Sequence, residues 1–359
     1  MFVDRSLIIK RKKILSRTIP FIIVGLAVFV LYLLFFVNID EMIGIIGRTN
    51  FSVYLLAIIA TILEMVFFAL AWQFFLKPLS ANLSFKKIFA YSWVGNFIDL
   101  LIPAESISGE ISRIFFATRD GVNSGKAAAS VITQRILGLL IVACTLILGA
   151  FRMFEMQIRF PSIVQTLIYL VMSTTAIFLF LIILIFIKEN WAHTIVKKII
   201  DFVKWVSRGR LGIGEWKERA DKAVDAFYES LRIFRVSPHK FVPPVVFSVF
   251  SWFFAILVYY LVFAAIGYVV NWIVIIVGYS IIIGLKSVPV GIPAEVGVTE
   301  IAMTVVFGAF GVPLYISAAT VVLIRLATVW FRLIIGFVAF QWVGIKAIVE
   351  DKNIFFHEN

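Results

Sequence analysis

The stretch PAESISGEISR at residues 103–113 has a near copy, PAEVGVTEIAM, at residues 293–303. The offset of 190 residues needs no gap, and it also relates Arg135 to Arg325. Chance similarity between apolar segments preserves leucine and valine, whereas this repeat preserves proline, glutamate and arginine, which are costly in a bilayer. Paired proline-interrupted segments in two halves of a chain are the sequence feature that indicates a transporter's substrate site.

The composition defines the class of protein. Of the 359 residues, 62% are hydrophobic and 15% are charged, against roughly 45–50% and about 25% in soluble domains. Several apolar runs reach about 20 residues, the length that crosses the hydrocarbon layer. The first, at residues 19–37, is long and has no small-residue cleavage site after it, so we expect an uncleaved helix. The sequence predicts an all-α polytopic membrane protein.

Cysteine and histidine usage argues against cofactor chemistry. Cys144 is the only cysteine, and the three histidines fall outside the apolar runs, so neither a disulfide framework nor a haem or metal centre is indicated. The sequence contains no Walker loop, no glycine-rich dinucleotide turn and no Ser-His-Asp set. We therefore expect no cofactor, no metal and no enzymatic activity.

The net charge of +12 is explained by the placement of the basic residues. Of the 33 lysines and arginines, 25 fall in segments that a cytoplasmic N-terminus would place on the cytoplasmic side. These segments are 1–18, 77–87, 119–126, 188–240 and 344–359. The positive-inside rule therefore predicts a cell-membrane protein with both termini in the cytoplasm, and nucleic acid is excluded as the reason for the charge.

We predict about six full transmembrane helices and two proline-broken re-entrant hairpins. The spans are expected at residues 19–37, 52–76, 125–151, 163–187, 241–267 and 314–343. The hairpins are expected at about 88–118 and 271–310, with breaks at Pro103 and Pro293, because their arms are too short and too polar to cross fully. Three crossings separate the hairpins, so the two copies should face opposite ways and form an inverted repeat.

Five regions follow from this plan, namely a basic cytoplasmic N-terminus, two membrane halves separated by an interfacial segment, and a cytoplasmic tail. Their boundaries are 1–18, 19–187, 188–240, 241–345 and 346–359. Segment 188–240 has apolar residues at helical spacing among twelve basic and seven acidic residues. This pattern predicts two amphipathic helices at the cytoplasmic interface, either as a connector packed against the bundle or as a docking region for lipid or a partner.

The candidate site consists of polar residues within the apolar sequence. An unpaired charge at the bilayer centre costs at least about 2.5–3.5 kcal/mol, so these residues must pair, become neutral or face water. Glu110 and Arg113, three residues apart on one helix, can pair locally. Asp99 is a weaker candidate, and we expect Glu64 to be a helix–helix contact. The predicted substrate-binding residues are Arg113, Arg135, Arg325, Glu105, Glu110, Glu295, Glu300, Asn96 and Lys286.

Arginine suits phosphate binding because it stays charged and presents a planar fork, while the glutamates suit proton relay or charge balance. Two structural interpretations stay open. The charges could be internal salt bridges that fix the hairpins against the long helices, or Glu105 and Glu295 could complement the N-terminal ends of the helices after the prolines. Arg113 aligns with Met303, so the first half has an extra cation and is the predicted phosphate side.

These motifs resemble those of the lysylphosphatidylglycerol synthase transmembrane-region family, also described as flippase-like or UPF0104-type membrane proteins. The resemblance runs from the first span to the last. The matching elements are Asn96, Pro103-Ala104-Glu105, Gly109-Glu110, Arg113, Gly121, Arg135-x-x-Gly138, Pro289, Pro293-Ala294-Glu295-Val296-Gly297, Glu300, Gly311-Val312 and Arg325.

The resemblance implies a flippase-like role. The best-understood members join such a membrane region to a cytosolic aminoacyl-transferase and move the aminoacylated lipid outward. No transferase domain is expected here, so we do not expect the synthase activity. Aminoacylated lipids and polyprenyl-phosphate-linked sugars are the cargoes that the resemblance suggests.

The expected function is therefore movement of an anionic or modified lipid headgroup across the bilayer. Two alternatives remain. One is a non-transporting accessory or anchor for a lipid-modifying or glycosylating enzyme, and the other is an ion-coupled carrier of a small soluble anion. Membrane lipids are the expected partners, and an enzyme partner and a homo-oligomer are both left open.

Overall fold

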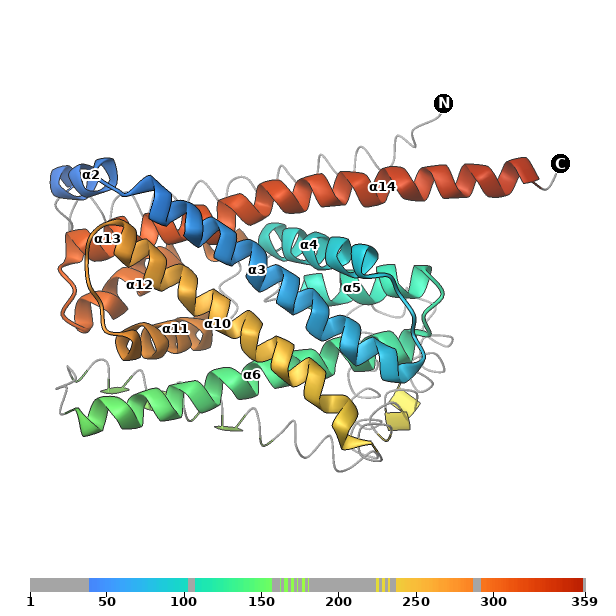
Figure 1. Ribbon diagram of the computed structural model, residues 1–359, viewed down its shortest axis with the longest axis horizontal. Helices are drawn as coiled ribbons and strands as arrows, with labels where there is room; N and C mark the ends of the chain where they lie inside the picture. Colours follow the sequence, from blue (N-terminus) through green and yellow to red (C-terminus); the bar gives the residue numbers. More distant parts are fainter. Residues whose placement is uncertain are drawn as a thin grey trace, which may run out of the picture.

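The computed structural model describes residues 39–102, 107–156, 237–286 and 292–357, with isolated positions between 162 and 232. These residues are helical with short connections and contain no strand (Figure 1), so the all-α polytopic membrane fold is confirmed. The predicted span at 19–37 and the first proline break, including Glu105, lie outside the described residues. The predicted span at 163–187 and the amphipathic segment 188–240 are represented by isolated positions and by the last few residues of the segment.

Four predicted spans fall in the described part of the chain, and each is a helix long and apolar enough to cross a membrane. The fourth is built from three consecutive helical elements. The bounds are α3 Phe51–Leu76, α6 Ser124–Glu155, α10 Val242–Ala265, α13 Leu314–Arg325, η4 Leu326–Trp330 and α14 Phe331–His357. A short helix, α2 (Ile39–Gly47), precedes α3 and packs against α13.

Each broken stretch folds into a pair of short antiparallel helices. The first pair is α4 (Phe85–Leu101) and α5 (Ile107–Arg119), in which Tyr91 near the start of α4 donates to Asp120 beyond the end of α5 (2.7 Å). The second pair is α11 (Trp272–Lys286) and α12 (Val298–Ala309). All four helices are shorter than the roughly 20 residues that a full crossing requires. Their re-entrant placement in a bilayer remains a prediction.

The second arm of the second hairpin begins later than expected. We expected helices at about 271–292 and 294–310, and α12 begins at Val298, while residues 287–291, after α11, lie outside the described residues. The short 3₁₀ turn η3 (Pro293–Glu295) precedes α12, and Ala294 and Glu295 have φ of 51° and 52°. Left-handed backbone cannot continue a right-handed helix, so the chain needs several residues to turn.

The repeat is visible in backbone geometry. At the end of α5, Val122 N–H donates to Ala117 O (3.1 Å), and at the end of α12, Val312 N–H donates to Phe307 O (3.2 Å). The glycine before each valine has φ of 87°. This is a Schellman ending, in which a left-handed glycine lets the chain reverse after a helix. The bond from Gly121 N–H to Thr118 O likewise has its counterpart 190 residues later, from Gly311 N–H to Gly308 O.

One pair of equivalent helices, α3 and α10, runs in opposite directions. The offset of 190 places α3 on α10, and these two helices pack along their length. Asn50 N–H, just before α3, donates to Ala265 O at the last residue of α10 (2.7 Å), while Phe67 stacks on Phe250 near the middle (5.1 Å). The antiparallel pair is the relationship that an inverted repeat requires. The orientation of each half in the membrane remains a prediction.

The halves also exchange contacts. The first hairpin helix of each half packs on the long helix of the other, α4 on α14 and α11 on α6 (Figure 1). Glycines allow the approach: a Cβ at Gly336 on α14 would lie 2.9 Å from Trp93 O, and one at Gly149 on α6 would lie 2.7 Å from a methyl group of Val277. Small residues at such crossings let helix backbones approach closely.

Candidate functional site

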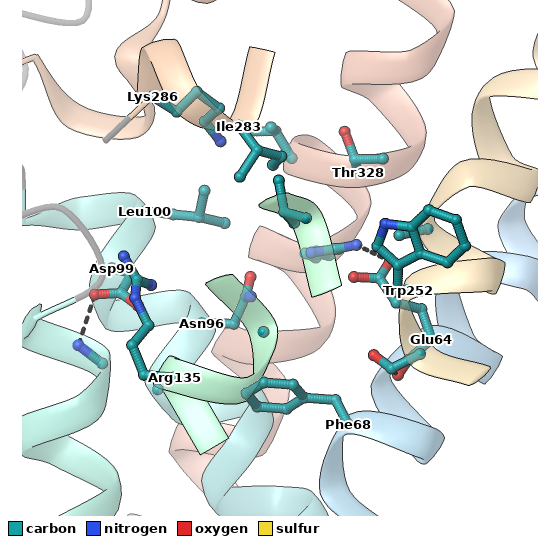
Figure 2. Close-up of a pocket in the computed structure, with 18 of the residues that line it drawn as sticks. Glu64, Phe68, Asn96, Asp99, Leu100, Arg135, Trp252, Ile283, Lys286 and Thr328 are labelled. Atoms are coloured by element: carbon teal, nitrogen blue, oxygen red, sulfur yellow. Dashed lines mark hydrogen bonds and ion pairs between the residues drawn. The ribbon is translucent and has the colours of Figure 1, made fainter. Parts of the chain in front are cut away.

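A cavity of about 430 Å³ lies between the two halves, lined by α3 to α6 on one side and by the elements from α10 to α14 on the other. Figure 2 shows Asp99, Asn96 and Arg135 on one side and Glu64 and Trp252 on the other. The charged residues that line the cavity are Glu64, Asp99, Glu110, Arg113, Arg135, Lys286, Glu295, Arg325 and Arg332.

The cavity brings together most of the residues that the sequence nominated. Seven of the nine predicted site residues line it: Asn96, Glu110, Arg113, Arg135, Lys286, Glu295 and Arg325. Glu300 lies behind Arg325 and contacts it directly, and Glu105 is outside the described residues. Asn96 and Lys286, both predicted with less sequence support, occupy equivalent positions in the repeat. Their role in binding substrate remains a prediction.

The first half contributes a loose ion pair. Arg135 on α6 lies with its Nε 3.6 Å from Glu110 Oε1 on α5, and their side chains are 39% and 24% exposed. This distance is too long for a direct hydrogen bond, although it is within ion-pair range. Both groups can therefore interact with water or with a ligand without first losing a tight contact.

Asp99 has a structural task at the edge of this cavity. Its Oδ1 accepts hydrogen bonds from Ser108 Oγ and from Gly109 N, both at 2.6 Å. A carboxylate at this position satisfies free N–H groups in the first turn of α5 and complements the helix dipole. Gly109 is required here because a Cβ on it would lie 2.5 Å from Gly95 O on α4. Asp99 therefore fixes α5 against α4.

Arg113 does not form the local pair with Glu110 that its spacing predicted. Glu110 pairs with Arg135, and the Arg113 guanidinium lies over the rings of Phe68 and Trp72, with its Cζ 4.9 Å and 4.6 Å from their centroids. Helical spacing allowed the local pair, but in the fold the guanidinium reaches the rings of Phe68 and Trp72 on α3. Cation–π contacts stabilise such a placement, more so when the cation is desolvated.

The second half contributes a closed network. Arg325 Nε donates to Glu300 Oε1 at 2.6 Å, and Arg325 Nη2 donates to Ala294 O at 2.5 Å. The other oxygen of Glu300 accepts from Gly297 N at 2.7 Å, and both side chains of the ion pair are 6% exposed. The buried charges are therefore paired and hydrogen-bonded, as burial in a low-dielectric environment requires.

This network holds the left-handed turn at Ala294 and Glu295. Non-glycine residues in this conformation cost of order 1–3 kcal/mol each and persist where the surroundings impose them. Arg325 binds the Ala294 carbonyl, while Glu295 Oε2 accepts from Thr299 Oγ1 (2.6 Å) and lies 3.5 Å from Lys286 Nζ. The prediction that salt bridges fix a hairpin against a long helix therefore describes the second half well.

A fourth ion pair in the cavity wall was not predicted from the sequence. Arg332 on α14 pairs with Glu64 on α3, and both side chains, 15% exposed, lie in the cavity wall. Glu64 was expected to be a helix–helix contact, which it is, but its partner lies 268 residues away in the sequence. The only sequence signal was an acid alone in one apolar span and an arginine that follows Arg325 in another. Nothing in the sequence linked them.

The π-helix η4 explains why Arg332 faces α3. In a regular α-helix, residues seven apart lie nearly on one face, so Arg325 and Arg332 would point the same way. The wide turn at Leu326–Trp330 lies between them and changes this register by about one residue, or roughly 100°. The equivalent stretch of α6 is regular α-helix. π-turns within helices occur frequently at functional sites.

The chemistry that the cavity offers is electrostatic. It holds several arginines, a lysine and carboxylates beside apolar and aromatic walls, which suits a polar group with an apolar tail. In the part of the chain that the structure describes, no group of three His, Cys, Asp or Glu side chains could hold a metal ion. The arrangement can bind, orient and exchange charged groups.

Comparison with known proteins agrees with the motifs. The family model described as "Lysylphosphatidylglycerol synthase TM region" matches residues 22–336. A UPF0104 membrane protein of Methanocaldococcus jannaschii is 27% identical over 345 residues, covering 95% of this chain and 98% of its own. Another, from Pyrococcus horikoshii, is 24% identical over 323 residues, covering 88% and 94%. The predicted resemblance is confirmed, and the chain belongs to the lysylphosphatidylglycerol synthase transmembrane-region family.

Proposed function

We propose that this protein is a flippase-like transporter that moves an anionic or modified lipid headgroup across the cell membrane. The observation that carries the proposal is a cavity lined by charged residues from both copies of the repeat. At about 430 Å³ it falls within the roughly 300–1,000 Å³ of small-molecule sites. A headgroup would occupy the cavity while the lipid tails stay in the bilayer.

The two repeats suggest how access would alternate. In inverted-repeat transporters, one half rocks or gates against the other around a fixed midplane site. Here the hairpin of each half packs on the long helix of the other, so a movement of one half changes contacts on both sides of the cavity. The proposal includes both termini in the cytoplasm and no enzymatic step.

Within this proposal, Arg113 and Arg135 bind the phosphate. Glu110 balances the charge of Arg135 when the cavity is empty and releases it to the headgroup. Arg325 and Glu300 hold the second hairpin, which they can do because their contacts are short and buried. Lys286 and Glu295 support it through a longer ion pair of 3.5 Å and through the hydrogen bond from Thr299 to Glu295. Asn96 supplies a neutral amide beside the phosphate.

The test is headgroup translocation in proteoliposomes, with a labelled anionic phospholipid and a reagent that does not cross the membrane. Arg135→Ala should reduce the rate strongly. Arg152→Ala is the matched control, because Arg152 lies on the same helix, far from the cavity lining, and its side chain is 70% exposed. Wild-type rates equal to those of empty liposomes, across anionic and prenyl lipids, would overturn the proposal.

The closed network of the second half favours a second candidate, an accessory or anchor for a lipid-modifying enzyme. Buried, fully paired charges can serve structure alone. This role predicts no translocation by the wild-type protein and no effect of Arg135→Ala on anything but partner activity. Measuring translocation and folding in the same preparations separates the two candidates.

A further inference from the structure

The cations of the cavity are not equivalent. Arg135, Arg325, Arg332 and Lys286 each lie within 4 Å of a carboxylate. Arg113 differs: within the described residues its guanidinium makes no hydrogen bond or ion pair, and its Nε is buried without a partner. The guanidinium lies over the faces of two aromatic rings, and the carboxylates of Glu110 and Asp99 interact with it electrostatically without a bond within 4 Å.

Among the described charged residues of the first half, Arg113 is also the most enclosed. The residue is 5% exposed, yet it lines the cavity. Gly95 on α4 makes room for it, because a Cβ there would lie 3.1 Å from Arg113 Cγ. The nearby Asp99 carboxylate is held by Ser108 and Gly109. A buried cation without a bonded counter-charge is costly, so this position suits an anion that comes from outside the protein.

The repeat supplies a comparison within the same molecule. The position equivalent to Arg113 is Met303, which is 1% exposed and also lines the cavity. Each half has a Glu–Arg pair, whereas a cation at the position of Arg113 occurs in the first half alone. Among the described residues, Arg113 is therefore the cavity-lining cation without a carboxylate within ion-pair distance, while the Asp99 carboxylate is taken up by Ser108 and Gly109.

We infer that Arg113 determines the charge specificity of the proposed transport site, and that the cavity takes a phosphodiester with a single negative charge in preference to a diphosphate. A phosphodiester supplies one negative charge, which is enough to bond the Arg113 guanidinium, because the Asp99 carboxylate is already held by Ser108 and Gly109. A diphosphate brings a second negative charge, for which a glutamate would have to leave its arginine or take up a proton. The inference rests on the proposed function, since it names the phosphate class that the same site selects.

The experiment compares binding of two probes to the full chain in nanodiscs. One is a short-chain phosphatidylglycerol, a phosphodiester, and the other is a short prenyl diphosphate. The wild type should bind the first more tightly. Arg113→Met, which copies the second half, should weaken phosphatidylglycerol binding by roughly ten- to hundredfold, the effect of losing a charge-assisted hydrogen bond. Arg152→Met removes an exposed arginine and should change neither affinity.

A variant that adds a cation to the second half tests the role of the Arg113 charge directly. Met303→Arg adds a second free cation at the equivalent position and should shift preference toward the diphosphate. Folding of every variant is checked by thermal unfolding, and if Met303→Arg unfolds, Met303→Lys tests the same prediction. Equal affinity of wild type for both probes, or an unchanged preference in Arg113→Met, would overturn the inference.

These outcomes are separable from failure of the proposed function. If the wild type binds phosphatidylglycerol with the expected preference but does not translocate lipid, the transport proposal fails and the binding specificity stands. If it translocates lipid and binds both probes equally, transport stands and the role of Arg113 is refuted. If it does neither, both fail.

Discussion

The two copies of the repeat place a glutamate and an arginine at equivalent positions and use them differently. Glu110 and Arg135 lie 3.6 Å apart and are partly exposed, whereas Glu300 and Arg325 meet at 2.6 Å and are almost fully buried. The second pair also binds the backbone at Ala294 and Gly297. The same two residue types form an adaptable site in one half and a fixed support in the other.

The difference comes from the surroundings of each pair. In the second half the left-handed turn brings the Ala294 carbonyl to Arg325. The guanidinium of Arg325 therefore donates to acceptors within the protein. In the first half, Asp99 fixes α5 to α4 through Gly109, and the counterpart of the turn, residues 103–106, lies outside the described residues. Glu110 and Arg135 form a longer and more exposed pair. One half can therefore respond to a ligand while the other keeps its shape.

The largest expected effect is on folding of the second half. Arg325→Met leaves Glu300 as a buried charge without its partner, which should cost about 3–5 kcal/mol of unfolding free energy. Thermal unfolding in detergent micelles measures it. Arg325→Met combined with Glu300→Gln should be less damaging than Arg325→Met alone, because no uncompensated charge is left.

A full-size loss in both the single and the double variant would show that the pair's shape, rather than its charge balance, supports the turn. If Arg325→Met lowers the unfolding free energy by less than about 1 kcal/mol, the range of exposed ion pairs, the two Glu–Arg pairs do not differ in their contribution to stability.

The second prediction compares the two glycines at which a hairpin helix of one half crosses a long helix of the other. Gly336→Ala should destabilise by about 1–3 kcal/mol, as overpacking does, because the new methyl group would meet the Trp93 carbonyl. Gly149→Ala should cost less, since its obstacle is a methyl group of Val277 that can move. Gly138→Ala is the matched control, with nothing within 4 Å of the new Cβ. Equal unfolding temperatures for the first two variants would contradict this ranking.

The smallest stability change is expected in the first half. Arg135→Met should alter the unfolding free energy by about 0–1 kcal/mol, as for exposed ion pairs, yet it should reduce headgroup translocation strongly under the proposed function. Parallel unfolding and translocation measurements on one preparation check both parts. A stability loss equal to that of Arg325→Met would mean that the first pair is structural too.

Gly138→Ala itself should stabilise α6 slightly, by roughly 0.5–1 kcal/mol, the usual gain from replacing glycine within a helix. Its open surroundings leave no steric cost to offset that gain. A lower unfolding temperature would indicate that the conformational freedom of glycine at this position is itself required.

Much of this protein could be predicted from its sequence because membranes impose strict rules on composition. The length and apolarity of the runs predicted the four described spans, and the placement of Pro103 and Pro293 predicted two broken helix pairs. The gapless repeat nominated residues that the structure brings to one cavity. Each prediction rests on local pattern, since a helix must satisfy its own backbone in lipid.

Partners could not be predicted in the same way. Sequence spacing paired Glu110 with Arg113, but the structure pairs Glu110 with Arg135, and Glu64 pairs with Arg332 from the other half. The direction of a side chain on a long helix depends on helix crossing and on the π-turn at Leu326–Trp330. Neither follows from the apolar pattern alone.

By itself the sequence determined the membrane class, the repeat and the set of charged residues, because the cost of placing charge and proline in lipid makes them few and conspicuous. Only the tertiary structure decided which charges are paired and which is available. It turned one Glu–Arg pair into a buried support, left its counterpart open and placed Arg113 against aromatic rings without a carboxylate partner among the described residues. The physical reason is that pairing depends on distances between helices far apart in sequence.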